Sequence, residues 1–144
     1  MPKKKKNSAA SDRVQRISFF DDEKNRPWLK LILDAYYIVD KGIAKALESE
    51  QKKGRKLACA KGCSYCCGID KDIPIYPLEI AAISWYAADK MKGRERDVLK
   101  QQLASFPKGN SCPFLIEVAC SIHPMRPVAC RQFNVFSSPC REDE

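Results

Sequence analysis

The most informative segment of this 144-residue chain is CAKGCSYCC, which spans residues 59–67. Its four cysteines follow the spacing C-x3-C-x2-C-C, with Gly62 and Gly68 beside them. A C-x2-C step lets the backbone curl so that two sulfurs face one point, and turn glycines expose backbone N–H groups toward those sulfurs. Thiolates at this spacing are the usual ligands of Zn²⁺ and of iron–sulfur clusters. The segment therefore predicts a thiolate metal site in an irregular loop.

Four further cysteines lie in the C-terminal part of the chain, separated by eight, ten and ten residues. All eight together can form two four-coordinate sites or one multinuclear site. Because neighbouring side chains diverge, we expect the adjacent Cys66 and Cys67 to serve different metals, or different irons of one cluster. A disulfide framework and a set of buried structural thiols are the alternatives, although scattered buried cysteines would not cluster in this way. The predicted metal ligands are Cys59, Cys63, Cys66, Cys67, Cys112, Cys120, Cys130 and Cys140.

Two arginines flank Cys130 and are expected to support the site. A metal held by four thiolates carries net negative charge, about −2 for Zn²⁺, and burial of that charge needs compensation. Arg126 and Arg131 are therefore predicted to be cofactor-binding residues that donate N–H groups to sulfur, the alternative being surface or ion-paired arginines. The only histidine, His123, is not expected to be a ligand, since eight thiols are available. With this single histidine, the sequence offers no further histidine for a nucleophilic Cys–His pair. No catalytic residue is therefore predicted.

Positive charge is concentrated near the N-terminus. The net charge is +8, of which residues 1–16 carry +5 and residues 58–144 only +1. We predict that residues 1–25 form a disordered, solvated basic tail; the alternative is that this tail alone contacts nucleic acid or anionic lipid, by phosphate electrostatics. No apolar stretch of roughly 7–15 residues follows Lys3–Lys6, so a signal peptide is not expected and the predicted location is cytoplasmic. Cytosolic thiols are kept reduced, which favours metal binding over disulfides.

The apolar pattern predicts a mainly α fold. Apolar side chains recur at steps of three and four over residues 28–46, after a helix-start signal at Pro27 and before an expected end near Gly54. A second helix should start at Pro77; it is apolar nearly all round and is expected to be a buried core helix. At about 14 residues it is too short to span a bilayer, so no membrane span is predicted. A third, amphipathic helix is expected over residues 94–106.

The C-terminal part is expected to be less regular. A short β-hairpin is predicted near residues 114–123 and a short helix after Pro127. Residues 26–144 would then form one small domain whose irregular cysteine-rich loops, over residues 57–140, make up a metal module. Without its cysteines the chain is about 38% apolar. A small domain with so few apolar side chains for its core usually has covalent or metal support.

The cysteines and their neighbours also resemble a known family. CAKGCSYCC is joined by Cys112-Pro-Phe-Leu, Cys120-Ser-Ile, Arg126-Pro-x-x-Cys130-Arg131 and a final Cys140. This joint motif is similar to that of the YkgJ-type cysteine-cluster proteins, a CxxCxxCC-type family described as a zinc- or iron-chelating domain. The resemblance implies a metal-binding domain that uses the eight cysteines. Glu79 stands where the family often has an acidic residue opening a helix, His123 stands where tyrosine is common, and the turn between Leu115 and Cys120 lacks the usual glycine.

Three classes of function are compatible with these features. The first is a metal-binding protein that coordinates zinc or iron through the eight thiolates, with a 4Fe-4S cluster as one form of the iron. The second is an iron–sulfur redox enzyme or enzyme component. The third is a metal-stabilised interaction module whose basic tail contacts nucleic acid. Neither a substrate nor a reaction can be read from the sequence, so whether the chain is an enzyme stays open.

Overall fold

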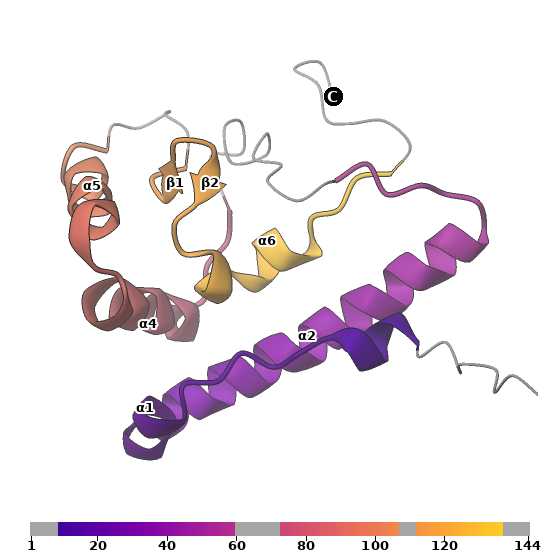
Figure 1. The fold of residues 1–144 in the computed structure, drawn as a ribbon, viewed down its shortest axis with the longest axis horizontal. Coiled ribbons are helices and arrows are strands. Elements are labelled where there is room, and N and C mark those ends of the chain that lie inside the picture. Colours follow the sequence, from indigo (N-terminus) through magenta and orange to yellow (C-terminus); the bar gives the residue numbers. More distant parts are fainter. Residues whose placement is uncertain (1–8, 60–72, 107–111, 137–144) are drawn as a thin grey trace, which may run out of the picture. The chain divides into compact units, whose positions relative to one another are not determined.

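The computed structural model describes residues 9–59, 73–106 and 112–136. The chain divides into two compact units, Met1–Lys56 and Leu57–Glu144, which are described in turn (Figure 1). Helices account for most of the described residues, with one short antiparallel sheet, so the prediction of a mainly α fold is confirmed. The boundary between the units, after Lys56, falls within residues 26–144, which the sequence predicts to be one domain with a metal module over residues 57–140.

The first unit is built on one long helix, α2, which spans Pro27–Lys52. Pro27 occupies its first turn, where a missing N–H costs nothing, and Gly54 follows its end with φ +84°, a conformation that favours glycine. Both ends therefore lie where the sequence predicts them. The buried face of α2 is rotated by part of a turn from the predicted one. The buried side chains of the helix are Leu29, Ile32, Leu33 and Tyr36. Ala46, at the end of the predicted apolar face, is exposed.

Residues 9–25 form structure where the sequence predicts a disordered tail. A 3-10 turn, η1 (Ala10–Arg13), and a short helix, α1 (Phe20–Asn25), both pack on α2 (Figure 1). Arg16 explains the docking, because its guanidinium binds Glu23 at 2.8 Å and Asp34 of α2 at 2.7 Å. The pair with Asp34 joins residues 18 positions apart, and local composition gives no sign of it.

The docking of residues 10–25 is expected to weaken in acid. Hydrogen bonding to Arg16 lowers the pKa of Glu23, and hydrogen bonds from Lys30 and Arg16 lower the pKa of Asp34. A carboxylate whose pKa is lowered by folding stabilises the folded state above its unfolded pKa, and that stabilisation is lost as the pH falls through the folded value. Amide hydrogen exchange in residues 10–25 should therefore speed up as the pH drops below the ordinary glutamate value of 4.5, after correction for intrinsic exchange.

An Arg16→Gln variant tests this interpretation. It removes the shared cation, so protection of residues 10–25 should already be low at neutral pH and should change less in acid. Equal protection in the variant and the parent protein at neutral pH would contradict the role given to Arg16.

The second unit begins, after the cysteine loop, with helix α4 (Pro77–Trp85), which continues as one π turn, η2 (Tyr86–Lys90). The predicted helix from Pro77 is thus present. It is less uniformly buried than predicted, because Ile80 is 52% exposed while the acidic Glu79 is buried. Helix α5 (Gly93–Ala104) follows, close to the predicted range, and buries Leu99.

The predicted hairpin and short helix are also present. Strands β1 (Leu115–Ile116) and β2 (Ala119–Cys120) pair antiparallel, and Glu117 takes the positive φ of 56° in the turn that lacks a glycine. A 3-10 turn, η3 (His123–Met125), which packs against α4, leads into helix α6 (Val128–Gln132). Within the described residues, no helix combines the length and apolar character needed to cross a membrane.

Candidate metal centre

The structure describes four of the eight predicted ligands, all in the second unit. Cys59, Cys112, Cys120 and Cys130 are each half-buried, and no disulfide joins any two of these four. The other predicted ligands, Cys63, Cys66, Cys67 and Cys140, lie outside the described residues, and so does the prediction that Cys66 and Cys67 serve different metals. Within residues 9–59, 73–106 and 112–136, no three His, Cys, Asp or Glu side chains gather as a metal site.

An antiparallel clasp, formed by residues 57–59 and 135–136, holds the start of the cysteine loop against the C-terminal segment. Leu57 and Phe136 form an isolated antiparallel bridge, and the Ala58 N–H donates to the Val135 carbonyl at 2.7 Å. The Val135 N–H in turn donates to Cys59 Sγ at 3.2 Å. A backbone N–H directed at sulfur stabilises negative charge on it, which suits a thiolate ligand.

The hairpin carries two more cysteines. Cys120 pairs with Leu115 across the strands, and the Cys112 carbonyl accepts the Leu115 N–H at 3.1 Å, so both cysteines belong to the base of the hairpin. The amide of Gln102, in α5, donates to the Leu115 carbonyl at 2.8 Å and fixes the hairpin against that helix. The hairpin therefore places Cys112 and Cys120 in one local structure.

A buried glutamate fixes the helix that carries Cys130. Glu79 is 2% exposed, and its Oε1 accepts the Val128 N–H at the start of α6 at 2.8 Å. Its Oε2 accepts the N–H of Tyr76, the residue before α4, at 3.0 Å. One carboxylate therefore caps two helices, one directly after the cysteine loop and one containing Cys130. The resemblance to the family suggested that Glu79 is an acidic residue at the start of a helix. It did not indicate the second partner of Glu79, Val128, which lies 49 residues away in sequence.

The two predicted support arginines lie in the segment around Cys130. Arg131 is buried, and its guanidinium donates to the carbonyls of Pro124 at 2.8 Å and of Arg126 at 2.9 Å, which braces the turn before α6. Arg126 Nε is buried and has no hydrogen-bond partner among the described residues, so it is a donor available to an acceptor. That either arginine donates to sulfur stays a prediction. His123, not expected to be a ligand, is exposed.

Tyr86 is a neighbour of Cys120 that the sequence analysis did not single out. Burial raises the pKa of Tyr86, and the charges of Glu95 and Cys120 raise it further. The phenol therefore keeps its proton and can act as a hydrogen-bond donor beside this cysteine. A tyrosine in a mainly apolar helix has no sequence signature that separates this position from an ordinary core position.

Comparison with known proteins assigns the second unit to a family. The family model CxxCxxCC, described as "Putative zinc- or iron-chelating domain", matches residues 58–142. The chain belongs to this family. The match covers more than half of the chain and agrees with the family predicted from the cysteine motif. No curated protein and no solved structure gave a match.

The described residues suit the metals named for the CxxCxxCC family. Thiolate sulfur is a preferred ligand both of zinc and of iron–sulfur clusters. The N–H···S contact at Cys59 and the buried Nε–H donor of Arg126 are the kind of groups that stabilise the negative charge of a metal–thiolate centre. The donor chemistry of this unit therefore fits zinc or iron.

Proposed function

We propose that the protein binds zinc or iron through its eight cysteine thiolates, and that this centre joins the loop at residues 59–67 to the segment 112–140. The clasp carries the proposal. It pairs residues 57–59 with residues 135–136, so the last cysteine of the loop follows the clasp by eight residues and Cys140 follows it by four. An extended chain covers at most about 3.6 Å per residue, so these two cysteine groups start from one point and stay within reach of each other.

The cysteines would hold the metal, and two arginines would balance its charge. Cys59 has its backbone N–H partner, the hairpin presents Cys112 and Cys120, and α6 presents Cys130. Arg126 offers a buried Nε in the same segment, which has no hydrogen-bond partner among the residues that the structure describes. Bound zinc would supply structural cross-links, whereas an iron–sulfur cluster would add one-electron chemistry. Thiols must stay reduced to ligate either metal, so we place the protein in the cytosol.

Anaerobic purification followed by elemental analysis and an absorption spectrum tests the proposal. We expect stoichiometric zinc in a colourless protein, or iron with acid-labile sulfide and visible absorbance. Because a zinc site lacks redox chemistry, the second result would favour the redox class and the first a structural or chelating role. A Cys59→Ser, Cys130→Ser variant should lose metal, with Ser121→Ala as the control outside the ligand set. Metal-free parent protein with fully titratable thiols would contradict the proposal.

A further inference from the structure

The net positive charge of the chain is confined to two stretches of the first unit. Residues 1–13 hold five basic groups and one acidic group, and residues 41–56 hold six basic and two acidic groups. These two stretches account for all of the +8, since the remaining residues are balanced in charge. The cysteine-bearing unit is nearly neutral, so the basic excess lies outside that unit.

The structure places residues 9–13, the described part of the first stretch, beside the second stretch. The Ala10 N–H donates to Glu48 Oε2 at 2.9 Å, and η1 packs on α2 near its C-terminal end. Arg13 is near enough to Glu48 to lower the pKa of that carboxyl, behind the larger effects of Ala10 and Lys52.

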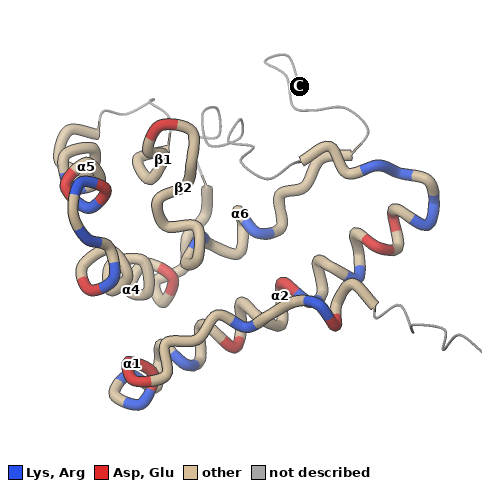
Figure 2. Tube along the Cα trace, viewed as in Figure 1, with Lys and Arg blue, Asp and Glu red and all other residues tan. Residues whose placement is uncertain are grey.

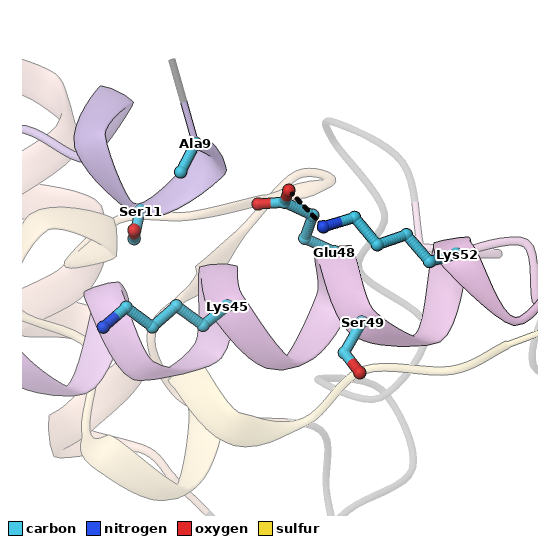
Figure 3. A pocket seen from close by; sticks show the side chains of 6 residues that line it. All are labelled: Ala9, Ser11, Lys45, Glu48, Ser49 and Lys52. Atoms are coloured by element: carbon cyan, nitrogen blue, oxygen red, sulfur yellow. Dashed lines mark ion pairs between the residues drawn. The ribbon is translucent and has the colours of Figure 1, made fainter. Parts of the chain in front are cut away.

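A cleft separates the two stretches. It has a volume of about 300 Å³ and is lined by Ala9, Ser11, Lys45, Glu48, Ser49 and Lys52. In Figure 3, Lys52 turns toward Glu48, to which it is ion-paired at 3.0 Å, while Lys45 extends away from that carboxylate on the side of Ser11. The lining thus combines two ammonium groups with two hydroxyl donors against a single carboxylate.

The carboxylates of this region do not neutralise its cations. Glu48 pairs with Lys52, and Glu50 is shared between Lys53 and Arg55. Lys45 and Lys56 form no ion pair with the residues that the structure describes. Figure 2 shows basic residues gathered at the C-terminal end of α2 and in the residues after it. Exposed, unpaired lysines are the groups that release counterions when they meet a polyphosphate.

We propose that the basic surface formed by residues 9–13 and 41–56 binds the phosphate backbone of a nucleic acid. No aromatic side chain lines the cleft, so base stacking is absent there and binding should not depend on base sequence. Nucleic acid is favoured over an anionic membrane because the cleft offers only one apolar side chain, Ala9, for insertion into lipid. The metal centre and this surface would then lie in different units.

Fluorescence anisotropy with labelled RNA tests the surface in the full-length protein. The probe is a single strand of about 16 nucleotides, with duplex DNA as a second probe. We expect a dissociation constant on the order of 10⁻⁴–10⁻⁶ M at physiological salt, weakening steeply between about 50 and 200 mM salt. A Lys45→Gln, Lys56→Gln variant should make the salt slope for RNA less steep by about 1.4, since each lost contact to a single strand contributes about 0.7.

A matched charge change in the other unit provides the control. Arg96→Gln with Lys100→Gln removes two exposed cations from α5 and should leave the salt slope unchanged. Three results would overturn the proposal: no anisotropy change at low salt, an equal effect of both double variants, or binding to phosphatidylserine vesicles without binding to RNA or DNA. Circular dichroism of both variants shows whether the fold is retained.

Discussion

Removal of the metal is expected to unfold residues 57–144 while α2 stays helical. Structural zinc sites supply about 10–16 kcal/mol of apparent binding free energy, which matches or exceeds the about 5–15 kcal/mol net stability of a typical domain. The second unit has short elements, with strands of two residues and α6 of five, which cannot be stable alone. The first unit has a 26-residue helix with its own ion pairs and contains no cysteine.

Hydrogen exchange resolved by segment separates the two units. Treatment with a chelator should remove protection from α4, α5 and α6 and leave α2 protected. A Cys59→Ser, Cys130→Ser variant should behave like the chelated protein, and the chelator should change it no further. If metal removal left the circular dichroism and the melting temperature unaltered, the metal would have no part in the fold.

The sequence predicted those features that depend on nearby residues. Pro27 and Gly54 mark the ends of α2, and Pro77 marks the start of α4, because a missing N–H and a positive φ are properties of single residues. The joint motif of the C-x3-C-x2-C-C segment with the segments around Cys112, Cys120, Cys130 and Cys140 was likewise sufficient to predict the zinc- or iron-chelating family. How the cysteines divide among metals depends on distances through space, which spacing along the chain does not determine.

The features that the sequence did not predict depend on partners far along the chain. Residues 10–25 look disordered by composition, but Arg16 pairs with Asp34 and Ala10 with Glu48, and each pair spans many residues. The buried face of α2 was misplaced because several neighbouring positions are apolar, and tertiary packing decides which of them is covered.

Replacement of Glu79 by alanine is expected to destabilise the second unit strongly. Glu79→Ala leaves the N–H groups of Tyr76 and Val128 without their acceptor, and loss of one helix-capping hydrogen bond costs about 0.5–2 kcal/mol. Loss of both caps, about 1–4 kcal/mol in a unit of this size, lowers the melting temperature by at least about 4 °C. Both helix starts should lose protection in hydrogen exchange, because the one carboxylate caps them both.

Two further variants separate this double cap from ordinary charge effects. Glu79→Gln keeps one carbonyl oxygen and should retain one of the two hydrogen bonds, so its loss of stability should lie between those of the parent and Glu79→Ala. Glu95→Ala removes an exposed carboxylate from the first turn of α5 and should cost only about 0.3–1 kcal/mol. If Glu79→Ala cost no more than Glu95→Ala, the cap would not be what holds α6 and its Cys130 in place. If it cost much more, with metal content reduced as well, the position of α6 would be set jointly by the carboxylate and the thiolate centre.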